Sequence, residues 1–184
     1  MKWLMGILIT VLMLVPMQSG AFQNEPNGFR DLYWGESLTE IESARTVQYV
    51  DSKQEYGDEY STYYVDFKDG ESKVLSGVPI AGENVRAFFY NGKLWRVDFE
   101  FHEDPNGWDS SYEKLKLAMI QLYGRPDEVI NEKTFSECLW VGETTTIELL
   151  RIVTIKRDKA ACVVNLKSTK TSNEISNPAR GSGW

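Results

Sequence analysis

The stretch VRAFFYNGKLWRVDFEF, residues 85–101, constrains the fold more than any other part of the chain. Apolar and polar side chains alternate on both sides of Asn91-Gly92, which is typical of two antiparallel strands joined by a tight turn. A one-residue slip moves every side chain to the other face, so the pattern selects the turn. A two-residue loop sets Ala87 opposite Arg96 and mixes polar with apolar side chains. We therefore predict a three-residue loop that ends at Gly92 in a bulge.

This register gathers the large apolar side chains of both strands on one face. They are Val85, Ala87, Phe89, Trp95, Val97, Phe99 and Phe101. The same register places Arg86 opposite Arg96 on the outer face, which is a modest repulsion.

Similar alternation predicts four more strands. They lie at 63–67, 135–141, 144–155 and 160–167. A turn at Gly142-Glu143 joins the second to the third and sets Cys138 opposite Ile147. The last hairpin pairs Leu150 with Leu166 and Thr154 with Cys162. The apolar phase changes after Leu149, which predicts a strand buried on both faces or a bulge.

Tyrosines and acids fill the region before the first long hairpin. We interpret residues 51–60 as a solvated loop rather than a metal cage. Tyr60, Tyr63 and Tyr64 are interpreted as strand packing, with a stacking platform for sugars or peptides as the alternative.

Two helices are predicted from their caps. Ser37 and Glu40 form a capping box that starts a short helix. The corner before it, Trp34-Gly35, is interpreted as a packing corner in which Gly35 turns the chain, the alternative being a ligand-stacking tryptophan.

A second capping box, Ser110 with Glu113, starts a longer helix. Its apolar stripe is Tyr112, Leu115, Met119, Leu122 and Tyr123, with Leu117 and Ile120 off it. Gly124 ends the helix in a left-handed conformation, and Pro126 prevents its continuation.

The sum is an α+β domain: an antiparallel sheet of about six strands with one main and one short helix packed on one face. We place this single domain at residues 22–168. Residues 169–184 are polar, lack apolar periodicity, and are predicted to be a disordered tail.

The first 21 residues have the layout of a secretory signal peptide: Lys2, an apolar run over residues 3–15, and small residues Ser19 and Ala21 before a cut at Phe22. The run of 13 residues is shorter than the roughly 20 needed to cross a bilayer, although a retained anchor is the alternative. No cysteine follows the run, and no paired arginines precede it, so lipoprotein and twin-arginine export are not indicated. We expect a periplasmic or secreted protein without a membrane anchor after cleavage.

The net charge of the chain bears on which classes of partner it can bind. Loss of Lys2 with the leader lowers the net charge from −7 to about −8. No basic stripe stands out against this acidic excess, which disfavours nucleic acid and anionic membranes as partners.

The chain has two cysteines, Cys138 and Cys162, and an exported protein could join them in a disulfide. In the strand pairing described above they lie seven residues apart along the middle strand, roughly 23 Å at ~3.3 Å per residue. Bridged Cα atoms lie within about 7 Å of each other, so we expect two unpaired, buried cysteines.

His102 is the only histidine. A dyad with Glu100 or Asp104 is conceivable, but a solvated strand end is the simpler interpretation. A histidine-rich zinc site is excluded. Asp104, Asn106 and Asp109 depart from calcium-loop spacing, and no phosphate-binding glycine motif, dinucleotide fingerprint or serine elbow occurs. No cofactor or metal is predicted.

Four stretches resemble a group of small exported bacterial proteins of unknown function. They are GFRDLYWGESLTEI, SGVPIAGENVRAFFYNGKLWRVDFEF, LYGRP and CLWVGETTTIEL, spanning most of residues 28–166. More distantly, the helix-then-sheet layout with a Gly-Pro helix exit is similar to outer-membrane assembly lipoproteins and β-lactamase-inhibitor-like folds. Those folds are interaction modules, although this chain lacks the anchoring cysteine of the lipoproteins. The resemblance implies a fold and transfers no functional residue.

Without a convergent catalytic set, we expect a non-enzymatic module that binds an envelope protein or a small ligand through the exposed side or edge of its sheet. The alternatives are a hydrolase that uses His102 with Glu100 or Asp104, and a structural envelope component that associates with itself.

Overall fold

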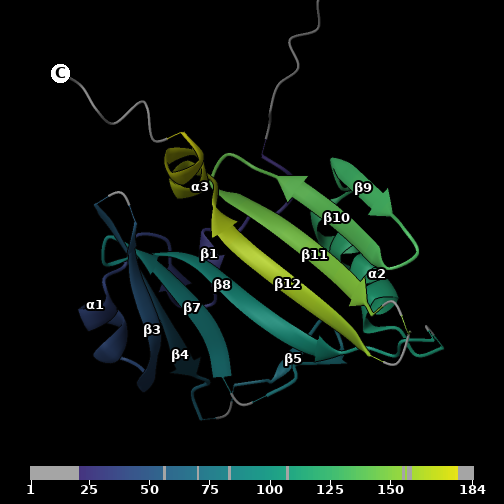
Figure 1. Cartoon of the computed structure of the whole chain (residues 1–184), viewed down its shortest axis with the longest axis horizontal. Coiled ribbons are helices and arrows are strands. Elements are labelled where there is room, and N and C mark those ends of the chain that lie inside the picture. Colours follow the sequence, from purple (N-terminus) through teal and green to yellow (C-terminus); the bar gives the residue numbers. More distant parts are fainter. Residues whose placement is uncertain are drawn as a thin grey trace, which may run out of the picture.

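The computed structural model describes residues 21–55, 57–69, 71–82, 84–106, 108–154, 156 and 159–177. The predicted signal peptide, apart from Ala21, lies outside them. The described chain is built on one eight-stranded antiparallel sheet (Figure 1). Its strands, in spatial order, are β3 (Val47–Glu55), β4 (Asp58–Asp66), β7 (Asn84–Tyr90), β8 (Lys93–His102), β12 (Ala160–Ser168), β11 (Thr145–Val153), β10 (Phe135–Val141) and β9 (Glu128–Asn131).

The sheet consists of two similar halves. Each half runs from a helix, α1 (Leu38–Glu42) or α2 (Ser111–Tyr123), into four antiparallel strands. The last strands of the halves, β8 and β12, pair antiparallel in the middle of the sheet.

The prediction of about six strands was too low, because both edge strands were missed. Strand β3 has almost only exposed side chains, and β9 has only exposed ones. An edge strand without a buried face has no apolar alternation, so the period-two signal is absent from its sequence. The stretch 51–60 is therefore the hairpin of β3 and β4 rather than a loop.

The hairpin of β7 and β8 also differs from its predicted register. Tyr90 pairs with Lys93, so the loop has two residues, and both Asn91 and Gly92 have positive φ. The bulge lies within β8 at Trp95 instead, because Phe89 pairs with Leu94 while Phe88 pairs with Arg96. The extra residue allows Leu94 and Val97, three positions apart, to be buried on one face.

The register of β11 corrects a second prediction. Leu150 pairs with Val163, three residues from the predicted Leu166, and no bulge interrupts the pairing with β12. The odd-numbered side chains face the core throughout: Thr145, Ile147, Leu149 and Val153 are buried, and Ile152 is 48% exposed. The alternation of core-facing and outward-facing side chains is therefore uninterrupted along β11. The sequence suggested a break because a charged residue, Arg151, occupies one of the core-facing positions.

The cysteines are closer than predicted but remain unpaired. Cys138 lies opposite Leu149 and Cys162 opposite Arg151, so the two are two residues apart along β11. They are on strands separated by β11, which places them at least about 9–10 Å apart, beyond the reach of a disulfide. Both are free and buried.

Both thiols are expected to be unreactive in the folded protein. Neither is exposed, and burial raises the pKa of the Cys162 thiol, which disfavours the reactive thiolate. Mass spectrometry after iodoacetamide treatment should show no addition under native conditions and two additions after unfolding, with or without reductant. Rapid labelling of the folded chain would contradict this packing.

The core lies between one face of the sheet and α2 with the N-terminal segment. α2 buries Tyr112, Leu115 and Met119 and lies behind β10 and β11 in Figure 1. Two small hairpins complete the cover: β1 (Gly28–Phe29) with β2 (Leu32–Tyr33), and β5 (Val74–Leu75) with β6 (Val78–Pro79). Burial of such large apolar side chains stabilises the fold by about 1.5–3 kcal/mol each before entropy.

The ends of α2 follow the predicted positions, with two differences. Ser110 Oγ accepts from Glu113 N–H at 3.3 Å, but a return bond to the Glu113 carboxylate is absent among the described residues, so the capping box is half formed. Leu122 is 44% exposed, whereas Ile120 and Tyr123 pack against the core.

Gly124 ends α2 at φ +86° and ψ −168°, a conformation essentially restricted to glycine. Gly124→Val is expected to lower the free energy of unfolding by at least about 1 kcal/mol, because a branched side chain is strained at positive φ. Thermal unfolding followed by circular dichroism checks this, and an unchanged melting temperature would contradict it.

The Trp34-Gly35 corner fastens the N-terminal segment to the sheet. Trp34 Nε1 donates to Thr145 Oγ1 at 2.7 Å, and that fully buried hydroxyl donates to the Pro26 carbonyl at 2.5 Å. Gly35 turns the chain at φ +87°. The corner leads into α1, where both bonds of the Ser37–Glu40 capping box are present.

The predicted disordered tail begins with a helix, α3 (Thr169–Ser176). Ser168 caps it by accepting from Thr171 N–H at 3.3 Å, and the hydroxyls of Thr169 and Thr146 lie 3.0 Å apart. Polar caps and contacts hold this helix, so apolar periodicity did not reveal it. Residues 178–184 lie outside the described residues.

Candidate functional site

The predicted catalytic alternative, His102, is exposed at the end of β8. It lines a cleft of about 390 Å³ together with Glu103, Asp104, Asp109 and other residues. Glu100, its other suggested partner, lines a different pocket. The structure thus brings His102 and Asp104 together and leaves Glu100 apart.

The carboxylates beside His102 already have structural partners. Glu103, whose side chain is fully buried, accepts from Arg151 Nε at 2.8 Å, from Ser110 Oγ at 2.8 Å and from Tyr112 N–H at 3.0 Å. Asp104 accepts from the backbone N–H groups of Asn106 and Trp108, and these bonds lower its pKa. Both acids therefore organise the start of α2 rather than a substrate.

The described residues contain no group of three or more histidines, cysteines or acids placed to hold a metal ion. Within the same ranges, no helix combines the length and apolar character needed to span a bilayer.

The sheet face opposite α2 offers a different kind of site, and we call it the open face. Cross-strand pairing places one residue from each of the eight strands in a single row across it. The row is Gln48, Tyr64, Arg86, Asp98, Asn165, Glu148, Leu139 and Glu128.

The middle of the open face carries a connected charged network. Its members are Arg86, Arg96, Asp98, Glu148, Asn165 and Lys167. Arg96 binds Asp98 with two nitrogens, at 2.6 and 2.7 Å, and Arg86 Nη2 lies 3.2 Å from Asp98 Oδ2. The network continues as Asn165 donates to Glu148 at 3.0 Å and Lys167 pairs with the same carboxylate.

This network is preorganised by burial and packing. Asp98 is 2% exposed beneath its two arginines, and both guanidinium groups also lie near the Phe88 ring, at 4.6 Å for Arg96 and 5.7 Å for Arg86. Burial alone would raise the pKa of Glu148, but the Lys167 and Asn165 side chains lower it overall. A charge held by several partners keeps one geometry, which is the requirement for specific recognition.

An apolar patch lies beside the network on β9 to β12. It consists of Ile130, Phe135, Leu139, Leu150, Ile152, Ala161 and Val163. On β10, β11 and β12 these residues alternate with buried core residues. Ile130 and Ile152 are 39% and 48% exposed. Glu137 stands between Ile130 and Leu150, and burial, assisted by Glu148, raises its pKa.

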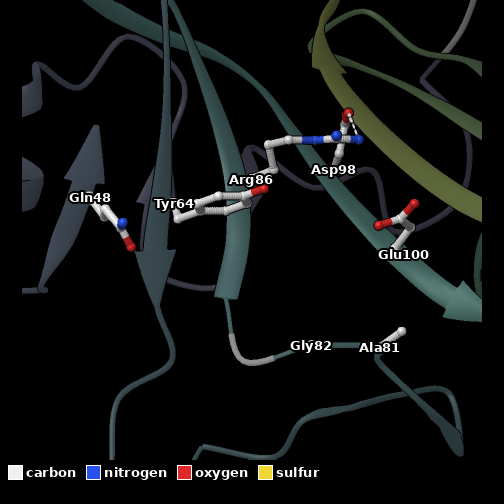
Figure 2. A pocket seen from close by; sticks show the side chains of 7 residues that line it. All are labelled: Gln48, Tyr64, Ala81, Gly82, Arg86, Asp98 and Glu100. Atoms are coloured by element: carbon white, nitrogen blue, oxygen red, sulfur yellow. Dashed lines mark hydrogen bonds and ion pairs between the residues drawn. The ribbon is translucent and has the colours of Figure 1, made fainter. Parts of the chain in front are cut away.

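A pocket of about 330 Å³ lies at the other end of the network (Figure 2). Gln48, Tyr64, Ala81, Gly82, Arg86, Asp98 and Glu100 line it. In Figure 2 the Arg86 side chain extends toward Asp98, and the Glu100 carboxylate stands apart from that pair. No hydrogen bond or ion pair of the Glu100 side chain occurs among the described residues, so its carboxylate is available to a cationic group.

Sequence reasoning missed the network because the predicted hairpin register was wrong. It set Arg86 against Arg96, whereas the structure sets Arg86 against Asp98. The alternation of Arg96, Asp98 and Glu100 in the sequence did signal a polar outer face on β8. The tyrosines predicted to pack within the strands have different surroundings. Tyr63 packs edge-on against Phe89, and Tyr64 faces the pocket.

Comparison with known proteins gives no matching family model, no matching curated protein and no matching solved structure. The resemblances expected from the sequence remain expectations.

Proposed function

We propose that this protein is a soluble, exported, non-enzymatic binding module that docks a protein partner on the open face of its sheet. The observation that carries the proposal is the charged network of six side chains beside the apolar patch. A sheet face that only contacts water usually carries neither a buried carboxylate paired with two arginines, as Asp98 is, nor adjacent apolar side chains on four neighbouring strands.

The combination matches the anatomy of protein interfaces. Such interfaces place apolar side chains and arginines at their centre and unpaired charges at the rim. Here Ile152 and Leu150 supply apolar area, and Arg96 is the most central arginine. Glu128 lies on the edge strand β9, and Glu100 lies on β8 opposite Val163 of the patch.

Charge indicates the chemistry of the partner. The side chains of Glu100, Glu128 and Glu137 make no hydrogen bond or ion pair within the described part of the chain, and the whole protein is acidic. A partner surface with apolar side chains flanked by lysine or arginine would complement them. The pocket of Figure 2 has room for one such basic side chain between Tyr64 and Glu100.

The geometry around His102 gives little support to the hydrolase alternative. His102 is exposed, and Glu103 and Asp104 hold Arg151 and backbone N–H groups. A general base requires a partner or substrate proton within hydrogen-bond reach, and the carboxylates that could orient His102 are engaged elsewhere.

Capture of a partner from an envelope extract by the wild type and by variants tests the proposal. Tagged protein should retain the same partner whether it is wild type or carries Leu117→Asp, a substitution of a 64%-exposed residue on α2. Ile152→Asp should reduce that capture at least about tenfold, because a charge becomes buried in an apolar contact. Charge reversal at Glu137 should also weaken capture, and His102→Ala should leave it unchanged.

Circular dichroism of each variant checks that it is folded. Equal capture by Ile152→Asp and wild type would contradict docking on the open face. Loss of a hydrolytic activity of the purified protein on His102→Ala would favour the enzyme instead.

A further inference from the structure

A further cavity lies on the core side of the sheet, beneath the N-terminal segment. It measures about 150 Å³. Phe29, Leu75, Met119, Tyr123, Ile147 and Leu166 supply its apolar lining, and Arg30 and Ser76 are among its polar residues. An apolar cavity of about this volume is known to accept a benzene-sized guest.

Arg30 occupies an unusual backbone position at this cavity. It is the first residue of the two-residue turn between β1 and β2, and its φ is +56°. Asp31, the second residue, has no positive φ. A hairpin turn with positive φ at its first position alone favours glycine there. A long charged side chain held in a strained conformation points to a use for that side chain.

The Arg30 guanidinium is held firmly but is not fully bonded. Its central carbon lies 4.8 Å from the Phe29 ring centre and 5.0 Å from that of Phe67. One terminal nitrogen, Nη2, donates to the Ser72 carbonyl. The other, Nη1, is buried without a hydrogen-bond partner, although Glu71 lies 3.3 Å away as an ion pair.

Within the described residues, the ion pairs around Arg30 include one more cation than carboxylate. The ion pairs around Arg30 join three cations, Arg30, Arg45 and Lys68, to two carboxylates, Asp31 and Glu71. Arg45, with a 2%-exposed side chain, binds both carboxylates. The pairs therefore form a connected group in which an added anion would balance the charge.

We propose that this cavity binds a small monocarboxylate with a compact apolar body, whose carboxylate pairs with the Arg30 side chain at the cavity wall and whose apolar body fills the space between Phe29, Met119 and Ile147. The site is independent of the open face, because it lies on the core side of the sheet. Benzoate carries both required features. Benzyl alcohol keeps the ring without the charge, and acetate keeps the charge without the ring.

NMR titration of the full chain without its expected signal peptide tests the site. Benzoate should produce saturable shifts around residues 28–31 and 75–77, with a Kd below about 1 mM. Benzyl alcohol should bind at least about tenfold more weakly, since it lacks the charge-assisted hydrogen bond. Acetate should not saturate.

Substitutions test separately the contributions of the Arg30 charge and of the apolar space to ligand binding. Arg30→Gln should weaken benzoate at least about tenfold and leave benzyl alcohol unchanged. The matched control is Arg125→Gln, at an exposed arginine after α2, which should change neither. Met119→Phe should fill the cavity and abolish both; if that variant does not fold, Leu75→Phe serves the same purpose at a partly buried position.

Three results would overturn the proposal: no saturation by benzoate, equal binding of benzoate and benzyl alcohol, or undiminished benzoate binding by Arg30→Gln. Failure of this titration would leave the open-face proposal untouched, because capture of a protein partner is measured at different residues.

Discussion

Replacing Glu103 with leucine is expected to lower the free energy of unfolding by about 3–5 kcal/mol, the range for breaking a buried ion pair from one side. The Glu103 side chain has no exposed surface and serves three donors: Arg151 Nε, Ser110 Oγ and Tyr112 N–H. Its removal leaves a mostly buried guanidinium and a helix-start N–H without their acceptor. Urea unfolding followed by circular dichroism measures the loss.

Two further variants separate the ion pair from the general effect of losing an acid. Glu113→Gln, at a side chain that is 61% exposed near Lys116, should change stability by less than about 0.5 kcal/mol. The double variant Glu103→Leu with Arg151→Met should recover part of the loss, because no unpaired charge is then buried. A loss below about 1 kcal/mol for Glu103→Leu would contradict the described anchoring of α2.

Gly28→Ala is expected to lower the free energy of unfolding by at least about 2–3 kcal/mol, because backbone strain and overpacking act together. Gly28 has φ +132°, and a Cβ there would lie 2.1 Å from the Leu32 carbonyl oxygen and 2.9 Å from Tyr33 Cα. These are backbone atoms of the facing strand β2, so no side-chain rotation relieves the collision. The β1–β2 hairpin must then leave its place over the core.

The matched control is Gly92→Ala. Gly92 also has positive φ, +71°, but a Cβ there meets no atom within 4 Å, so the variant should cost only the strain of about 1–2 kcal/mol. Thermal melts of the two variants measure the difference. Equal melting temperatures would show that the close approach of β2 to Gly28 does not exist.

The sequence predicts the interior of this fold better than its edges. Strands β7, β8, β10, β11 and β12 and helix α2 each bury one face, and the alternation of Val85, Ala87 and Phe89 or the spacing of Tyr112, Leu115 and Met119 records that burial. Strands β3 and β9 bury almost nothing, so their sequences carry no such record. Edge strands are paired through backbone groups, which every sequence possesses.

The pairing register of the strands was harder to predict than their existence. The bulge at Trp95 shifts the alternation by one residue in mid-strand, and Arg151 breaks the apolar phase of β11 although it stays on the core side. Arg151 can stay there because Glu103, 48 residues earlier in the chain, meets it. A partner so distant in sequence leaves no local pattern to read.

The candidate site depended on that register. The predicted repulsion between Arg86 and Arg96 becomes a shared pairing with Asp98 once the hairpin is correctly aligned. The apolar patch was hidden for a related reason: the predicted pairing set Leu150 opposite Leu166, a buried core residue, whereas Leu150 pairs with Val163 on the open face. Three-dimensional pairing was needed to place them on the open face.

The central claim, that the open face is free in the isolated protein and covered by a partner, is tested most directly by NMR with a soluble paramagnetic probe. Without partner, the methyl groups of exposed Ile152 should broaden much as the exposed Leu117 methyls do, those of half-buried Leu150 should broaden less, and those of buried Leu149 should not broaden. After addition of the captured partner, Leu150 and Ile152 should become protected while Leu117 stays accessible. Protection of Leu150 and Ile152 in the free protein, or their continued exposure in the complex, would contradict the account.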